Sequence, residues 1–422
     1  MTGRNLQSLR RRVVITGLGV VSPSGIGKDA FWSSIVNGRS GIDWIETFDT
    51  SNLYCKIAGE ILNFTASDYM NPKEARRAGR FAHFAVAAAR LALKDADLDP
   101  SGLNPYQIGA VMSTSTAGSG EHSIPLYSAF EHHGADAVEI THPTQVLAHS
   151  ATSHVFIELG LKGPNTTAGS ACAGSLDAVA ICHNILRSGQ AQVMLAGGTE
   201  ANVTPFGMGV LCRQRVLSAN NDPPRAACRP YDATRDGIVI SDGAGVVVLE
   251  TAAHALDRGA RIYAEVLGYS SATEAFHLMA SVPTGEELAH AFRAALLQAK
   301  LAPQDVDYIC AHGVGNRPYD TAETNAFKQV LGERAYNLPV SSIKSSTGQP
   351  FAAGGAWQLT SSCMTLETGL VPPTINYRVP DPECDLDYVP GHARRARVDT
   401  IAINAHSFGG THCCLLLRRF AV

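Results

Sequence analysis

Two distant segments share one pattern, in which a glycine turn leads directly into an apolar strand. The turn at 242–245 precedes the apolar run at 246–249, and the turn at 409–412 precedes the apolar run at 413–417. Strands that are apolar throughout are typical of a sheet covered by helices on both faces. The repeat therefore predicts an α/β protein built from a duplicated unit.

The same alternation of strands and helices is expected in both halves of the chain. Apolar runs predict strands at 13–19, 108–113, 192–196, 244–249, 262–268, 306–311, 340–343, 400–404 and 413–417. Helical spacing predicts helices at 28–37, 75–96, 176–186, 286–299, 321–331 and from about 352. Glycine and proline are scattered, so we expect no flexible linker between the halves.

The composition excludes several classes of function. The chain has 422 residues, of which 45% are hydrophobic, with no apolar run close to the ~20 residues of a membrane span. A formal charge of −4 gives no reason to expect nucleic acid. The basic N-terminus lacks an apolar signal core, and the ten cysteines have no zinc-type spacing. We expect reduced thiols, no metal and a cytoplasmic location.

The first predicted strand carries glycines that invite a dinucleotide-binding interpretation. Gly17 and Gly19 fit the beginning of the fingerprint, but Ser22 stands at the third glycine position and Pro23 follows. The fingerprint is broken, so no nucleotide site is predicted here.

Cys172 is the strongest candidate for chemistry. It lies among small residues at 169–175, immediately before the helix predicted at 176–186. The positive end of a helix favours a thiolate, and small neighbours leave room for an acyl group. Cys172 is therefore predicted to be a nucleophile. Most other cysteines are expected to be inert core residues, among them Cys182, Cys310, Cys363 and Cys413.

Three later segments offer partners for this cysteine. His312 follows a strand and precedes glycines, so it is either a hydrogen-bond donor to a substrate carbonyl or a structural histidine. Lys344 begins a Ser/Thr-rich loop that ends before Gln349, which is either part of the site or a polar helix entry. The glycine-containing loop at 406–411 either completes an oxyanion hole or is a tight turn.

Together these segments resemble the β-ketoacyl-ACP synthases of the thiolase fold, in particular the elongating synthase II type and its type II polyketide relatives. The likeness runs from residue 12 to residue 419, through segments 12–19, 194–200, 229–232, 236–237, 242–245 and 372–376. It implies a thiolase-like fold of duplicated αβαβα layers. Residues 1–258 would form the half that carries the nucleophile, and residues 259–422 would form the half that carries its partners.

The resemblance assigns roles to several residues. Cys172 matches the acyl-accepting nucleophile, and His312 matches the first catalytic histidine. Asp320 and Glu323 stand at the family's spacing beyond it, and Lys344 matches the active-site lysine. The cysteine would take an acyl chain from a carrier protein. The enolate of a decarboxylated malonyl-carrier thioester would then attack it, with no cofactor beyond the phosphopantetheine of the acyl carrier protein.

The chain departs from the family around these residues. Gln349 replaces the second catalytic histidine, and Gln358 replaces the glutamate usually paired with the lysine. Val314 and Asn316 replace threonines that contact the phosphopantetheine arm. A glutamine amide can donate a hydrogen bond but cannot act as a base, so we expect condensation to survive, more slowly or with narrower substrates.

The loop at 406–411 also departs from the family. Phe408 matches the phenylalanine that gates the acyl pocket, and its N–H would form an oxyanion hole with that of Cys172. His406 stands where a phenylalanine is usual, and Ser407 where a glycine is usual. We expect the serine to restrict loop opening. His406 is a competing candidate for the missing imidazole.

The family likeness also suggests partners. A homodimer is expected, or a heterodimer with a ketosynthase-like or chain-length-factor subunit. Five basic residues match places where the family docks the acidic carrier protein, or else form a solvated surface: Lys73, Arg76, Arg77, Arg80 and Arg215.

Three functions remain open at this point. The first is a ketosynthase of polyketide or fatty acid biosynthesis. The second is a ketosynthase-like acyltransferase that moves the acyl group to an alcohol or amine without decarboxylation. The third is a non-catalytic partner subunit, against which the retained Cys172 argues.

Overall fold

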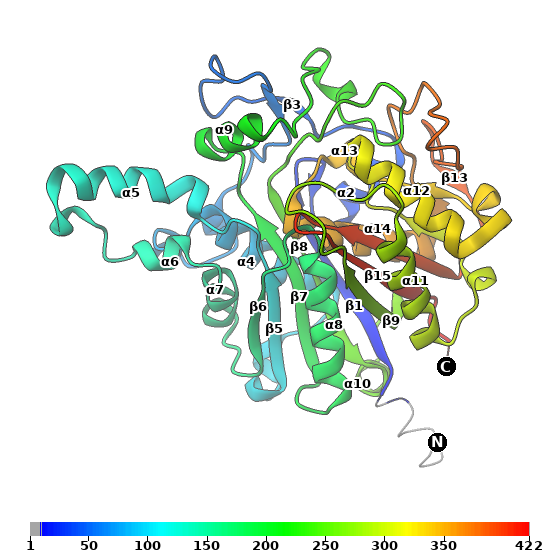
Figure 1. Ribbon diagram of the computed structural model, residues 1–422. Helices are drawn as coiled ribbons and strands as arrows, with labels where there is room; N and C mark the ends of the chain where they lie inside the picture. The colour runs from blue at the N-terminus through cyan, green and yellow to red at the C-terminus, as the bar shows by residue number, and fades with distance from the viewer. Residues whose placement is uncertain (1–8, 10, 422) are drawn as a thin grey trace.

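The strands of both halves join in one central sheet (Figure 1). The protein is described by a computed structural model, which covers residue 9 and residues 11–421. The strands of the first half follow the order β1 (Val13–Ser22), β8 (Gly243–Thr251), β7 (Val193–Glu200), β5 (Ile108–Ser113) and β6 (Asn165–Ala168). Those of the second half follow the order β9 (Ala264–Thr273), β15 (Thr411–Arg418), β14 (Thr400–His406), β10 (Tyr308–Cys310) and β11 (Val340–Ser341).

The two halves of the sheet repeat one another. In each, the first three strands are antiparallel and the last two join in parallel, and β1 meets β9 at the centre. The two similar segments of the sequence become β8 and β15, which hold the same place in their halves. The predicted duplication is confirmed. The remaining strands are short: β2 (Gly25–Ile26), β3 (Asp43–Trp44), β4 (Ile57–Ala58), β12 (Leu370–Val371) and β13 (Arg394–Arg395).

Helices lie in three layers around the strands. α8 (Gly174–Arg187) and α14 (Gly354–Thr368) contact each other and share one hydrophobic core. α8 contacts mainly β7 and β5, whereas α14 contacts strands of both halves, among them β8, β7 and β14. α4 (Arg80–Asp95) covers β1, β8 and β7 within a second core, and α11 (Glu286–Ala299) covers β9 and β15 within a third. This arrangement gives the predicted αβαβα layers. The other helices are α2 (Lys28–Val36), α3 (Pro72–Ala75), α5 (Ser119–His133), α6 (His142–Val146), α7 (Ser150–Leu159), α9 (Pro205–Gln214), α10 (Ala252–Asp257), α12 (Arg317–Leu331) and α13 (Lys344–Thr347). Among the described residues, every helix is too short or too polar to span a bilayer.

The duplication also places the site. Cys172 lies in a short 3₁₀ turn, Ala171–Ala173, that leads into α8, and the turn Phe351–Ala353 leads into α14 in the same way. Both turns begin with a residue at positive φ, 49° at Ala171 and 45° at Phe351, and the two turns are in contact. The start of α14, with Gln349 just before it, is therefore brought beside Cys172.

Some predicted elements differ from the observed ones. The helix expected at 75–96 is observed as α4, which begins only at residue 80, and the separate short helix α3 ends at residue 75. The loop expected at 344–348 is the short helix α13. α12 starts four residues earlier than predicted, because Pro318 fits the first turn of a helix, where its missing N–H costs no hydrogen bond.

The glycines of β1 serve helix packing. A Cβ atom on Gly19 would lie 1.9 Å from the carbonyl oxygen of Ala88 in α4, so only glycine allows this approach. β1 is antiparallel to both β8 and β9, unlike the parallel strands of a dinucleotide-binding βαβ unit.

Candidate active site

A small cavity lies over Cys172 and is lined by both halves of the chain. Its volume is about 20 Å³, room for about one water molecule. Of the predicted site residues, Cys172, His312, Gln349, His406 and Phe408 meet here, and Lys344 and Ser407 lie behind them. Six further residues complete the lining: Val216, Ile238, Val314, Asn316, Tyr319 and Phe351.

The resting nucleophile is a thiol. Burial raises the pKa of Cys172 to about 12, although the positive charge of Lys344 and the side chain of Gln349 act in the opposite direction. The prediction of a thiolate is therefore wrong. The partial charge at the end of α8 is too weak to offset the loss of water around the buried sulfur.

His312 is held through its main chain. Its N–H donates to Glu323 Oε1 at 2.6 Å, and the N–H of Gly313 donates to Glu323 Oε2 at 2.9 Å. Lys344 Nζ donates to the carbonyl of His312 at 2.7 Å. Burial and the charge of Lys344 lower the pKa of His312 well below its usual value. The imidazole is therefore neutral and has one N–H to donate.

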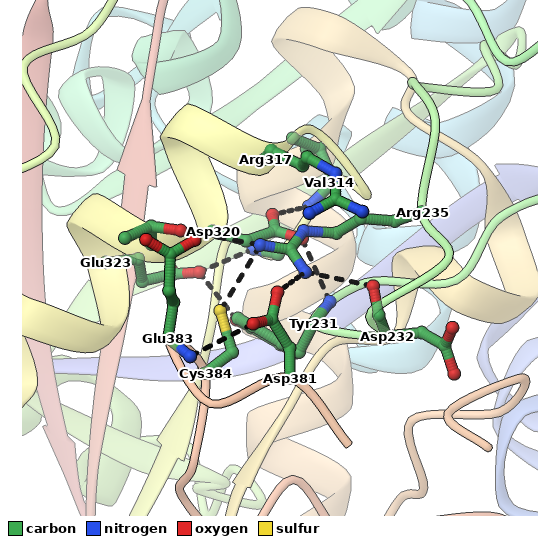
Figure 2. Close-up of polar contacts among 12 residues, drawn as sticks. Tyr231, Asp232, Arg235, Val314, Arg317, Asp320, Glu323, Asp381, Glu383 and Cys384 are labelled. Atoms are coloured by element: carbon green, nitrogen blue, oxygen red, sulfur yellow. Dashed lines mark hydrogen bonds and ion pairs between the residues drawn. The ribbon is translucent and has the colours of Figure 1, made fainter. Parts of the chain in front are cut away.

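A buried ion-pair network supports the turn after His312 (Figure 2). Asp320 accepts the N–H groups of Tyr231 at 2.9 Å and Val314 at 3.0 Å. Arg235 Nε lies 3.3 Å from Asp320, and its Nη1 donates to Asp381. The guanidinium side chain is completely buried. Arg235 thus compensates the charge of the carboxylate that shapes this turn.

Gln358 and Lys344 do not form the pair that the family uses. Gln358 Nε2 donates to the carbonyls of Cys310, Ala311 and Asn404 at 2.9–3.1 Å, which a carboxylate cannot do. In the described part of the chain Lys344 forms no ion pair with a carboxylate. The positive charge of Lys344 instead acts to lower the pKa of Cys172 and that of His312.

Replacing Lys344 by methionine is expected to slow alkylation of Cys172. The lysine charge lowers the pKa of this thiol, so its removal raises that pKa further and reduces the thiolate fraction at every pH below it. A change of one pKa unit corresponds to about tenfold in rate. Iodoacetamide labelling between pH 7 and 10, followed by intact mass, measures the effect, with the exposed Lys94→Met as control. Identical rate profiles for wild type and Lys344→Met would contradict this role.

The loop at 406–411, which we call the gate loop, is tied to the nucleophile turn. Ser407 Oγ donates to the carbonyl of Ser170 at 2.7 Å and accepts the N–H of Ala173 at 2.9 Å. Phe408 borders both the cavity over Cys172 and a second cavity of about 230 Å³. The second cavity is further lined by Ser115, Thr116, Ser119, Gly120, Ala171, Cys172, Asn202, Phe206, Gly207, Val210, Leu211, Gln214 and Phe351.

Replacing Ser407 by alanine is expected to loosen the gate loop. Both hydrogen bonds are lost, each worth about 1 kcal/mol, so long acyl groups should load onto Cys172 several-fold faster while thermal stability falls. Loading rates with short and long acyl-carrier proteins measure this effect, and the exposed Ser188→Ala is the control. An unchanged ratio of long-chain to short-chain loading rates would contradict the claim that the Ser407 hydrogen bonds restrain the gate loop.

The five basic residues are not equivalent. Lys73, Arg76 and Arg77 are exposed, and so is Arg215, which lies next to the cavity residue Val216. Arg80 is half-buried and is engaged within the fold, because it donates to the carbonyl of Ile61 and packs over the ring of Phe84 at 4.9 Å.

Tyr319 and Phe351 line the cavity although no local motif of the sequence marks them as site residues. Tyr319 lies within 4.9 Å of the His406 ring, centroid to centroid. Phe351 had a signal in the sequence, since its segment repeats the small-residue turn of Cys172, but the likeness is visible only once the duplication is aligned.

Comparison with known proteins gives the family. The description "Beta-ketoacyl synthase, N-terminal domain" matches residues 10–255, and "Beta-ketoacyl synthase, C-terminal domain" matches residues 263–378. A 3-oxoacyl-[acyl-carrier-protein] synthase 2 from Synechocystis sp. is 39% identical over 97% of this chain and 99% of its own length. The tetracenomycin polyketide synthase ketoacyl synthase alpha subunit from Streptomyces glaucescens is 41% identical over 97% of each chain.

Solved structures agree with this assignment. A type II polyketide ketosynthase, solved with its acyl carrier protein and bound to a hexaketide, superposes with a TM-score of 0.90 at 33% identity, covering 97% of this chain and 100% of that one. The ishigamide ketosynthase/chain length factor superposes with a TM-score of 0.89 at 32% identity, covering 98% and 100%. These sequence and structure likenesses extend over nearly the whole chain and include both halves of the fold. The chain belongs to the β-ketoacyl synthase family, as an acyl-transferring enzyme of the β-ketoacyl-ACP synthase type.

Proposed function

We propose that this protein extends an acyl group held on Cys172 by decarboxylative Claisen condensation with malonyl-ACP, in polyketide or fatty acid biosynthesis. One observation carries the proposal. Cys172, neutral His312 and Gln349 come from separate segments of both halves and line a single cavity. The family contributes the reaction type, and the residues present supply a nucleophile and two neutral hydrogen-bond donors.

The first step loads the cysteine. The sulfur of Cys172 attacks the thioester carbonyl of an acyl-carrier protein, and the carrier thiol leaves with the proton of the cysteine. We assign the oxyanion hole to the N–H groups of Cys172 and Phe408, two residues that line the cavity and whose N–H groups donate to no other described residue.

The second step forms the carbon–carbon bond. The bond to the malonyl carboxylate breaks, carbon dioxide leaves, and its electron pair forms an enolate. The enolate carbon attacks the acyl carbonyl, the carbon–sulfur bond breaks, and the cysteine recovers a proton from solvent. Burial raises the pKa of Cys172 to about 12, which favours return of the released sulfur to the thiol form. His312 and Gln349 donate N–H groups to the enolate oxygen, and this step requires no general base.

Partners and carriers follow from this chemistry. The substrates arrive on the phosphopantetheine of an acyl carrier protein, and we assign the protein no other cofactor. We propose a dimer in the cytoplasm, with a second copy or with a chain-length-factor-like subunit. The ishigamide relative, solved as a ketosynthase/chain length factor, supports the second arrangement.

Reversing the charge of Arg215 is expected to weaken use of the carrier. Arg215 is exposed beside the cavity residue Val216, where an acidic carrier would deliver its arm. The Arg215→Glu variant should raise the KM for malonyl-ACP about tenfold at low salt, with a smaller difference at 0.5 M salt. Steady-state kinetics at the two salt concentrations measure this, with the exposed Arg397→Glu as control. An equal effect of both substitutions would argue against docking at Arg215.

Intact mass spectrometry tests the proposed function. Incubation with an acyl-carrier protein should add one acyl mass at Cys172, and malonyl-ACP should then remove it with release of carbon dioxide. Acylation followed by transfer to an alcohol or amine, without carbon dioxide, would favour the acyltransferase alternative. No acylation at all would favour a partner subunit.

A further inference from the structure

We propose that His406 is a second catalytic imidazole of this site, which donates a hydrogen bond to the enolate oxygen and is positioned by the pair Glu274–His412. This inference rests on the proposed condensation and names a further residue that stabilises its intermediate. His406 lines the cavity with Cys172, His312 and Gln349, and only 1% of it is exposed.

Strand pairing sets the histidines side by side. His406 is the last residue of β14, and in the antiparallel pair with β15 it stands directly opposite His412. Directly paired residues of adjacent strands present their side chains on the same face of the sheet. The two ring centroids are 5.1 Å apart with an interplanar angle of 32°. The register of the sheet therefore fixes this pair.

The other side of the His406 ring faces the site. Its centroid lies 4.3 Å from that of His312, with the rings at 61° to each other. Tyr319 packs against it at 4.9 Å, and the Tyr319 hydroxyl is fixed by donating to the carbonyl of Met279 at 3.1 Å. The imidazole is thus enclosed by aromatic rings and has little freedom to turn away from the cavity.

The ring nitrogens of His406 have no hydrogen-bond partner within the described part of the chain. Both Nδ1 and Nε2 are buried, and so is Oε1 of Gln349, which also lacks a partner. Buried polar atoms in folded proteins are nearly always paired. Because His406 lines the cavity over Cys172, we infer that an oxygen of the bound thioester accepts a hydrogen bond from the N–H of His406 during the reaction.

Glu274 holds His412, the histidine that lies beside His406. Its Oε1 lies 2.8 Å from His412 Nε2 and accepts from Ser281 Oγ, and its Oε2 accepts the N–H of Val282. The side chains of Glu274 and His412 are each only 1% exposed. A carboxylate only accepts hydrogen bonds, so the proton of His412 sits on Nε2. Glu274 and His412 are positioning residues, since they act on the substrate through His406.

A neutral imidazole suits this task. Burial lowers the pKa of His406 well below its usual value, as do His412 and Lys344 nearby. The neutral ring keeps one N–H, which can donate to the oxygen that becomes negative as carbon dioxide leaves. No bond to His406 forms or breaks, and its proton stays in place. His406 thereby restores the imidazole donor that Gln349 does not supply.

Two substitutions at His406 test the proposal. Carbon dioxide release from malonyl-ACP is measured in parallel with acylation of Cys172 by intact mass. His406→Phe should lower carbon dioxide release by about 10²-fold, the effect of losing one donor to an oxyanion, with acylation within about twofold of wild type. His406→Asn keeps an N–H donor and should recover about tenfold of this loss. The buried but remote His154→Phe should leave both rates unchanged.

The outcomes separate this inference from the proposed function. Unchanged carbon dioxide release in His406→Phe, or an equal loss of acylation and release, would overturn the role of His406 while wild-type condensation still stands. A wild-type enzyme that is acylated but releases no carbon dioxide would overturn both. Glu274→Gln should lower kcat for carbon dioxide release without changing the KM for malonyl-ACP. A change in KM alone would overturn the positioning role.

Discussion

Replacing Cys172 by alanine is expected to abolish acyl loading and to lower condensation by roughly 10⁴-fold or more, the scale seen when a nucleophile is removed. The cavity, His312 and Gln349 remain, but no sulfur is left to hold the acyl group. Intact mass should show no acyl adduct, and product analysis should show no β-ketoacyl carrier. Cys212→Ala, which removes a nearby buried thiol, is the control.

The same variant separates the two steps. The donors to the enolate oxygen are intact in Cys172→Ala, so malonyl-ACP should still lose carbon dioxide and leave acetyl-ACP. Residual acylation of the variant protein would instead place the acyl group on another of the ten cysteines, all of which are buried, and would contradict the role of Cys172.

Replacing Arg235 by methionine is expected to be the most destabilising single change. The fully buried guanidinium faces Asp320 and Asp381, and its loss leaves two buried carboxylates without their counter-ion (Figure 2). Breaking a buried pair in this way costs about 3–5 kcal/mol of the free energy of unfolding. Urea denaturation measures the loss. Arg397→Met, which breaks an exposed pair with Asp399, should cost less than about 1 kcal/mol.

The destabilisation should depend on pH. Burial raises the pKa of Asp320 to about 7, and Arg235 opposes this rise. A carboxyl whose folded pKa is raised loses stability as pH increases from its unfolded pKa, about 4, up to its folded pKa, and the loss levels off above that value. Without Arg235 the pKa of Asp320 rises further, so the loss should be larger at pH 8.5 than at pH 6. A loss that is constant between these pH values, or that is not reduced by adding Asp320→Asn, would contradict the pairing.

Hydrophobic periodicity and turn residues predicted those elements of the fold that depend mainly on short-range sequence. The helix at 286–299 is observed with the predicted limits, and the repeated glycine turns identified the duplication. Only the beginning of the helix predicted at 75–96 was wrong, because the helical periodicity of the sequence continues through a break before residue 80 that tertiary packing imposes. α4 begins after Gly79, where an added Cβ would lie 2.5 Å from the carbonyl of Gln145.

The site could be predicted only in part. Cys172, His312 and Gln349 were found from local motifs and family likeness, and they meet in one cavity. The pairing of His412 with Glu274 depends on the register of β14, β15 and β9, which no local pattern reports. The protonation state of Cys172 was missed because it depends on how completely the folded chain excludes water from the sulfur.

The most direct test of the central claim is the stoichiometry of one turnover. Protein acylated at Cys172 is mixed with one equivalent of malonyl-ACP, and carbon dioxide, the protein mass and the carrier mass are followed together. We expect one carbon dioxide released for each acyl group lost from Cys172, and a carrier that has gained the acyl mass on the acetyl unit left by decarboxylation. Loss of the acyl group from Cys172 without carbon dioxide, or with unextended carrier, would contradict condensation at this site.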